Sequence, residues 1–163
     1  MTEIDVHVRL AIESDAETIH HGLKLIAAHL SLEDKVTATV EDIRTHGFGS
    51  KPAFEALIAE VDGHYAGMCL FFDSFSTWGG RRGAYIQDLV VDQRFRGLGV
   101  GEKLLRATIA RVSANGGRYV RLSVDAGNVQ AQRFYEKMGL EWCREERIYA
   151  LRGDAFAAAA GLR

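Results

Sequence analysis

Three glycines alternate with apolar residues in the stretch 96–101, which reads Arg-Gly-Leu-Gly-Val-Gly. Glycines leave the backbone N–H groups of a loop uncovered. The apolar period that follows predicts a helix over 102–112, whose first N–H groups and positive dipole end point to the same place. An apolar run predicts a strand over 85–91 just before the loop. The chemistry expected here is binding of a phosphate-bearing ligand, and the alternative is a plain turn that begins a helix.

The spacing of the glycines excludes two common classes of phosphate-binding loop. A dinucleotide-binding fingerprint, G-x-G-x-x-G, needs its third glycine where this chain has Glu102 or Leu104. A nucleoside-triphosphate loop needs Gly-Lys-Ser/Thr, and the sequence contains no such stretch. The pattern R-x-x-G-x-G fits without exception, through Arg96, Gly99 and Gly101. Arg94 is a second candidate for phosphate binding, with a solvated surface charge as its alternative.

The predicted strand 85–91 contains one carboxylate, Asp88, among apolar residues. Strand alternation turns Asp88 to the face opposite Gln87 and Leu89. A charge placed there needs a partner or a function. Two roles remain open for Asp88: acceptor binding or proton relay, and a structural ion pair or hydrogen bond. No Ser/His/Asp or Cys/His arrangement is legible, and the histidines lack metal-ligand spacing, so no metal is expected.

Composition limits the function classes. The chain has 163 residues, a single proline and no low-complexity linker, which predicts one domain over 1–163. A net charge of −2 argues against nucleic-acid binding. No apolar run approaches about 20 residues and the N-terminus lacks a signal-peptide pattern, so no membrane partner is expected. The separate cysteines Cys69 and Cys143 indicate free thiols in a cytoplasmic protein.

Apolar periodicity predicts the elements that position these residues. Strands are expected over 6–12, 54–61, 64–72, 85–91, 119–124 and 141–151. Helices are expected from Ser14, with Glu17 completing a capping box, from Thr39, over 102–112, from Asn128 to residue 137, and over 153–162. The Asp62-Gly63 pair predicts a hairpin, and 74–82 a loop. This order predicts an α+β fold: a mixed central sheet with an antiparallel N-terminal meander, flanked by helices.

Three segments together resemble the GNAT family of N-acetyltransferases. They are the strand 85–91, the loop 96–101, and Asn128 followed by Phe-Tyr-Glu-Lys-Met-Gly at 134–139. The resemblance extends over nearly the whole chain. Within the family the chain is similar to the diamine branch, whose members acetylate spermidine, spermine or thialysine. Gly-Phe-Gly at 47–49, the stretch 57–61 and Trp78 carry this narrower similarity.

The resemblance implies a GNAT fold and acetyl-CoA as cosubstrate. In the family the R-x-x-G-x-G loop holds the pyrophosphate, strand backbone pairs with the pantetheine arm, and an asparagine touches the cofactor. The matching cofactor-binding positions here are Leu89, Val90, Val91, Arg96, Gly97, Leu98, Gly99, Val100, Gly101 and Asn128. Asn128 is also a candidate helix cap. Tyr135 matches the family's proton donor to the departing thiolate, and its alternative role is packing.

The candidate acceptor-binding residues are Gln87, Asp88 and Asp125, and Asp88 is, with Tyr135, a candidate catalytic group. The diamine branch has Glu-Asp where this chain has Gln87-Asp88, and a glutamine cannot neutralise an ammonium. The expected function is acetyl transfer to a primary amine of a small molecule, diamine-, polyamine- or thialysine-like. The alternatives are an amino-acid-like or peptide acceptor and a non-catalytic acetyl-CoA sensor. A homodimer is implied by resemblance.

Overall fold

The computed structural model describes residues 4–162. Among them, five strands form one mixed sheet in the order β1-β2-β3-β4-β5. Antiparallel pairing joins β1 (Val6–Leu10), β2 (Glu55–Val61), β3 (His64–Ser76) and β4 (Arg81–Val91), whereas β5 (Val120–Leu122) runs parallel to β4. The expected α+β class, with an antiparallel N-terminal meander in a mixed sheet, is therefore confirmed.

The helices are α1 (Ala16–Leu30), α2 (Val40–Phe48), α3 (Val100–Ala114), α4 (Val129–Lys137) and α5 (Gly153–Ala159). Short 3-10 turns occur at η1 (Glu13–Asp15), η2 (Glu33–Lys35) and η3 (Gln93–Phe95). The chain forms two compact units, Met1–Ser123 and Val124–Arg163, and each is described by itself. The first holds the sheet with α1 to α3, and the second holds α4 and α5.

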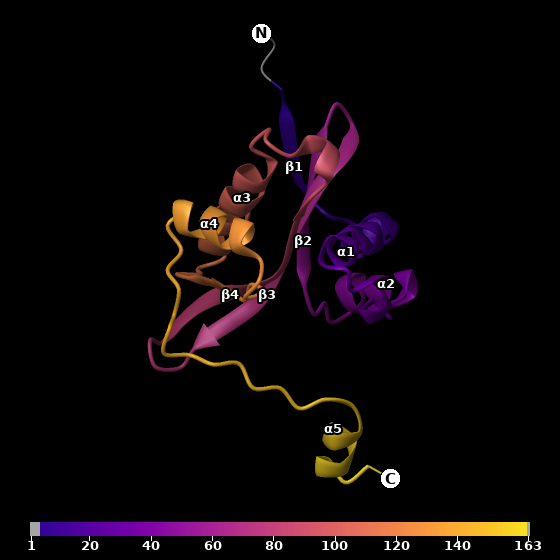
Figure 1. Ribbon diagram of the computed structural model, residues 1–163, viewed down its shortest axis with the longest axis vertical. Helices are drawn as coiled ribbons and strands as arrows, with labels where there is room; N and C mark the ends of the chain where they lie inside the picture. Colours follow the sequence, from indigo (N-terminus) through magenta and orange to yellow (C-terminus); the bar gives the residue numbers. More distant parts are fainter. Residues whose placement is uncertain (1–3, 163) are drawn as a thin grey trace. The chain divides into compact units, whose positions relative to one another are not determined.

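Helices cover both faces of the sheet in the first unit (Figure 1). On the face of α1 and α2, a buried apolar cluster joins the helices to β2, β3 and β4; its members include Ile19, Ile43, Ile58, Met68, Leu70 and Val90. On the other face, α3 is anchored through residues that are fully or almost fully buried, namely Val100, Leu104, Leu105 and Thr108. Because α3 is fixed along its length, the loop before it has a fixed position too.

A β-bulge interrupts the pairing of β3 with β4. Leu70 pairs with Asp88, but Phe71 pairs with Ile86, so Gln87 is an extra residue in β4. Paired residues share a face of the sheet, and Leu70 belongs to the cluster beneath α1. Asp88 therefore lies on the α1 face, opposite Leu89, as the strand alternation predicts.

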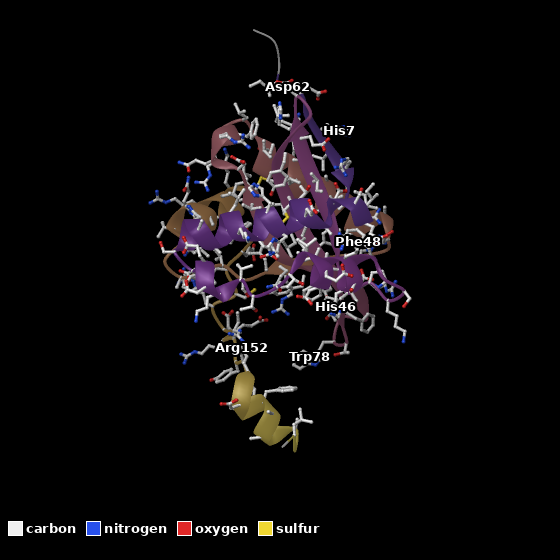
Figure 2. The ribbon with its side chains drawn as sticks, turned by 90° about the vertical axis from the view of Figure 1, so that its right-hand side faces the viewer. His7, His46, Phe48, Asp62, Trp78 and Arg152 are labelled. Carbon is white, nitrogen blue, oxygen red and sulfur yellow. The ribbon has the colours of Figure 1, made fainter. Side chains whose placement is uncertain are left out.

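Two local signals of the sequence are confirmed. Thr39 caps α2: its hydroxyl accepts the N–H of Asp42 (3.1 Å), and the Asp42 carboxylate accepts the N–H of Thr39 (2.7 Å). At the β2–β3 turn, Asp62 and Gly63 both have positive φ, 50° and 76°, as a two-residue hairpin with the native strand twist requires. Asp62 lies at one end of the sheet and Trp78, in the β3–β4 turn, at the opposite end (Figure 2).

The capping box predicted at Ser14 and Glu17 is wrong. Helix α1 begins after Asp15, whose carboxylate accepts the N–H of Ile12 (2.7 Å). The same carboxylate receives two hydrogen bonds from the Arg9 guanidinium (2.8 and 2.9 Å). A charged partner from β1, Arg9, therefore fixes the start of α1. A local pattern in residues 14–17 cannot predict this contact.

The loop predicted over 74–82 is also wrong in extent. Ser74, Phe75 and Ser76 continue the β3 ladder by pairing with residues 83, 82 and 81 of β4, which leaves only 77–80 as the turn. Serines at 74 and 76 suggested a loop, but the pairing with β4 outweighs their low strand propensity. β3 and β4 thus extend beyond the end of β2 as a two-stranded arm.

The last predicted strand, 141–151, is wrong, whereas the C-terminal helix is confirmed as α5. A strand is stable when its backbone groups pair with a neighbour. In the described part of the second unit there is no other strand, and the apolar side chains of 141–151 are exposed, Trp142 by 72% and Tyr149 by 90%. None of the helices in the described part of the chain has the length and apolarity that crossing a bilayer requires.

Candidate active site

The glycine loop ends in a set of backbone amides without protein acceptors. Gly97 and Gly99 have φ of 78° and 77°, a left-handed conformation that side chains with a Cβ adopt at a cost. The first amide of α3 that finds a carbonyl is that of Lys103, which donates to Gly99 (3.0 Å). Within residues 4–162, the amides of 97–102 donate to no protein group. They therefore fit an anionic ligand at the helix N-terminus.

The two arginines beside the loop have different environments. The Arg94 guanidinium binds both carboxylate oxygens of Asp92 (3.1 and 2.8 Å), and Asp92 also accepts the N–H of Arg94. This pairing lowers the pKa of Asp92 and explains how a carboxylate that is only 7% exposed stays charged. Arg96 is exposed, and its guanidinium forms no hydrogen bond or ion pair with any described residue. Arg94 is thus a structural partner of Asp92, and Arg96 remains the free cation of the loop.

β4 has an open edge beside the loop. β5 pairs with β4 only at Ala84–Ile86, so the part of β4 that contains Leu89 and Val91 has no strand neighbour on that side among the described residues. Its other edge pairs with β3, through Cys69 for Leu89 and Gly67 for Val91. Unpaired strand edges bind extended ligands through main-chain hydrogen bonds. The edge and the loop are continuous, because η3 alone separates them.

Asp88 lies on this segment of β4 and is half-buried. Burial raises the pKa of its carboxyl group from 3.8 to about 6. Among residues 4–162, no hydrogen bond or ion pair reaches the Asp88 carboxylate, so the structural ion pair or hydrogen bond that the sequence left open for this side chain is wrong. A carboxylate that is partly desolvated and has no protein partner is suited to bind a cation or to accept a proton. Gln87, the bulged residue beside it, is exposed.

Asn128, Asp125 and Tyr135 lie in the second unit. The Asn128 side chain caps α4 by accepting the N–H of Ala131 (3.1 Å), so its predicted capping role is confirmed. Asp125 accepts the N–H of Gly127 (2.8 Å) and orders the turn before that cap. Tyr135 is half-buried in α4 and contacts Phe134 edge to face, with ring centroids 5.4 Å apart.

Residues 24–140 match the acetyltransferase (GNAT) family. The chain belongs to this family. A bovine (Bos taurus) thialysine N-epsilon-acetyltransferase is 30% identical over 167 residues, covering 96% of this chain and 98% of that protein. An L-ornithine N5-acetyltransferase of Arabidopsis thaliana is 36% identical over 93 residues, covering 57% of this chain and 41% of that protein.

The likeness extends to solved structures. An integron cassette protein from the mobile metagenome of V. cholerae superposes with a TM-score of 0.80 at 18% identity, covering 95% of this chain and 97% of that one. At this identity the likeness concerns the fold. GNAT proteins use acetyl-CoA as cosubstrate, and the amides of 97–102 fit its phosphates.

The described residues of this GNAT protein contain no cluster of three or more His, Cys, Asp or Glu side chains that fits a metal ion.

Sequence reasoning missed the aromatic residues beside Asp88. Phe72 lies in β3, Tyr85 in β4, and Tyr119 immediately before β5, and all three are half-buried. Phe72 pairs with Tyr85 across the strands, and their rings stack with centroids 5.3 Å apart. The bulge at Gln87 is the reason: regular alternation places Tyr85 and Asp88 on opposite faces, so the sequence gives no signal of the face that they share.

Proposed function

We propose that this protein is an N-acetyltransferase that transfers the acetyl group of acetyl-CoA to the primary amine of a small molecule, diamine-, polyamine- or thialysine-like. One observation carries the proposal: β4 and the loop after it hold a half-buried carboxylate without a protein partner, an open strand edge, and unpaired backbone amides at the start of α3. Similarity to a thialysine acetyltransferase over almost the whole chain supports the acceptor class.

The donor site in this proposal consists of the loop and the strand edge. Backbone amides from Gly97, Leu98, Gly99, Val100 and Gly101 bind the pyrophosphate, and Arg96 adds a charge-assisted bond. The backbone of Leu89, Val90 and Val91 binds the pantetheine arm along the open edge, and Asn128 adds a contact from the second unit. Gly97 and Gly99 favour this reading, because a Cβ there opposes the left-handed backbone that aims the amides.

The acceptor site in this proposal contains Asp88, with Gln87 and Asp125 as additional polar groups. An alkyl ammonium has a pKa near 10.4 and must lose a proton before it attacks. Ionised Asp88 binds the ammonium and accepts that proton. Bound acetyl-CoA supplies the acetyl group as a thioester, and the Tyr135 hydroxyl donates a proton to the departing sulfur. Because Asp88 titrates near pH 6, acceptor binding weakens as the pH falls through that value.

We further propose that residues 1–163 act as one N-acetyltransferase domain in a cytoplasmic homodimer. The family match at 24–140 extends across the junction between the two compact units, which favours one functional domain. Both cysteines are free thiols, as is usual in a reducing compartment. The dimer follows from resemblance to the diamine branch, and sedimentation of the full chain tests it.

An amino-acid-like acceptor is the second candidate. Gln87 favours it, because the diamine branch has a glutamate there and an uncharged amide also accommodates a carboxylate-bearing acceptor. The similarity to an ornithine acetyltransferase supports the same idea over part of the chain. Ornithine carries a side-chain amine together with an α-carboxylate, so comparing it with its decarboxylated diamine separates a diamine acceptor from an amino-acid acceptor.

The test is thiol release from acetyl-CoA with four acceptor classes: diamines, thialysine, ornithine and short peptides. We expect turnover with at least one amine and loss of that turnover in Asp88→Asn. Thermal stabilisation by acetyl-CoA without turnover on any acceptor refutes the enzyme and favours a sensor. Faster turnover of ornithine than of its decarboxylated diamine refutes the diamine acceptor and supports the second candidate. Asp73→Asn, an exposed carboxylate on the opposite face of β3, is the matched control.

A further inference from the structure

A short turn joins the two parts of the donor site. The open edge of β4 ends at Val91, and the unpaired amides of the loop begin at Gly97. Residues 92–96 connect them and contain the 3-10 turn η3. A long ligand that binds one part presents its other end to the second part at a high effective concentration, but only if the protein holds the two parts at a matching separation. The geometry of this turn therefore matters for the ligand.

Asp92 is the residue that fixes the turn. Its N–H donates to the carbonyl of Ala66 in β3 (2.8 Å), and its carbonyl accepts the N–H of Phe95 (2.9 Å). Its carboxylate accepts the N–H of Arg94 (2.9 Å) and two bonds from the Arg94 guanidinium (3.1 and 2.8 Å). The backbone groups and both carboxylate oxygens of Asp92 are thus all bonded, and the residue is only 7% exposed.

Arg94 braces the turn from its solvent side. The Arg94 side chain is 69% exposed, and its guanidinium lies 5.4 Å from the centroid of the Phe95 ring while it pairs with Asp92. A fully exposed ion pair contributes little to stability. In this pair the carboxylate is buried and the planar guanidinium binds both of its oxygens, so losing either partner leaves a desolvated charge or an open turn.

The glycines after the turn make such a restraint necessary. Gly97 and Gly99 give the loop its positive φ angles, but glycines also have more conformational freedom to lose than other residues. On the far side the loop is held by α3, whose first residue, Val100, is 1% exposed. Asp92 supplies the restraint on the strand side. A loop that is held at both ends loses less freedom when a ligand binds its amides.

We propose that Asp92 is a positioning residue for acetyl-CoA, which sets the separation between the β4 edge and the loop amides so that one molecule binds both. The inference rests on the donor site of the proposed function. Asp92→Asn removes a negative charge and releases the Arg94 guanidinium, and both changes favour phosphate binding by charge alone. The positioning role predicts the opposite result, weaker binding of acetyl-CoA.

The experiment is calorimetry of the full chain with two ligands. Acetyl-CoA is long enough for the loop and the edge, whereas 3′-phospho-ADP, its nucleotide half, ends at the pyrophosphate and reaches the loop alone. The ratio of the two Kd values measures what the strand edge adds, and an effect of charge on phosphate binding cancels in it. We expect Asp92→Asn to lower the advantage of acetyl-CoA about tenfold, as the loss of one charge-assisted hydrogen bond does.

Glu55→Gln is the matched control. Glu55 of β2 pairs with Arg111 in the last turn of α3, so this variant removes an ion pair from the helix that follows the loop but leaves the turn intact. It is expected to keep the wild-type ratio. Arg94→Gln is expected to lower the advantage of acetyl-CoA as Asp92→Asn does, and it decides the matter even if Asp92→Asn fails to fold.

Three results overturn the positioning role and leave the proposed acetyl transfer intact. They are a wild type that binds both ligands equally well, a ratio that the variants at 92 and 94 leave unchanged, and a ratio that Glu55→Gln lowers as much as they do. A wild type that does not bind acetyl-CoA overturns the donor site and the proposed function together.

Discussion

Replacing Asp88 with asparagine is expected to make the protein more stable while making it a poorer enzyme. Burial raises the pKa of the Asp88 carboxyl group from 3.8 to about 6, and no described residue forms a hydrogen bond or ion pair with it. At neutral pH the folded protein therefore holds a desolvated charge without a partner. Asparagine has nearly the same shape and carries no charge, so the cost of that charge disappears.

The sign and size of the effect follow from proton linkage. Between pH 3.8 and about 6 the folded state binds a proton at Asp88 that the unfolded state has lost, so the wild type loses stability as the pH rises through this window. Above pH 6 the loss is complete and amounts to at most about 3 kcal/mol, at 1.36 kcal/mol for each pKa unit. Below the unfolded value of 3.8 both proteins carry a neutral group and have similar stability.

The assay is urea unfolding of wild type, Asp88→Asn and Asp73→Asn at several pH values from 3.5 to 8. The difference between Asp88→Asn and wild type is expected to grow from near zero to as much as about 3 kcal/mol, with most of the growth before pH 6. Asp73 is exposed, so its variant is expected to show no comparable trend. A difference that does not change with pH, or that falls as the pH rises, refutes the reasoning. Asp88→Asn is also expected to keep its binding of acetyl-CoA while it loses turnover of the amine. This result would show that the variant is folded and that its loss of activity is not a loss of structure.

Three further predictions concern the glycine loop, the proposed acid Tyr135 and the packing of Tyr119. Gly99→Ala strains a backbone at φ 77° by about 1–2 kcal/mol and is expected to weaken acetyl-CoA binding in calorimetry, whereas Gly63→Ala, equally strained at φ 76°, leaves binding unchanged. Tyr135→Phe is expected to lower kcat about a hundredfold or more with the acetyl-CoA Kd unchanged; an unaltered kcat excludes the acid role. Gly83→Ala forces a Cβ against Tyr119 and is expected to cost about 1–3 kcal/mol in thermal unfolding.

Local signals in the sequence predict the donor site well. The alternating glycines at 97–101 and the apolar period after them specify a loop with positive φ followed by a helix, and the structure has both. The Asp62-Gly63 hairpin and the Thr39 cap are of the same kind, because each depends on residues within four positions of one another. Such features follow from the intrinsic backbone preferences of the residue types involved.

Features that depend on residues distant in the sequence could not be predicted from local patterns. The start of α1 depends on Arg9 of β1 rather than on Ser14, and the length of the β3–β4 arm depends on pairing that outweighs the serines at 74 and 76. The segment 141–151 has the composition of a strand but no partner strand within its unit. In each case a tertiary neighbour, or its lack, overrides the local preference.

The bulge at Gln87 is the feature that brings Asp88 and Tyr85 to the same face of β4. In a regular strand Tyr85 and Asp88 have opposite parity, so their side chains point to opposite faces. The extra residue restores them to one face, since Tyr85 pairs with Phe72 and Asp88 with Leu70. One inserted residue thus places the unpartnered carboxylate beside the stacked rings, while Leu89 and Val91 keep the open strand edge next to the glycine loop. Asp88 and Tyr85 share a face of β4 because that strand is irregular.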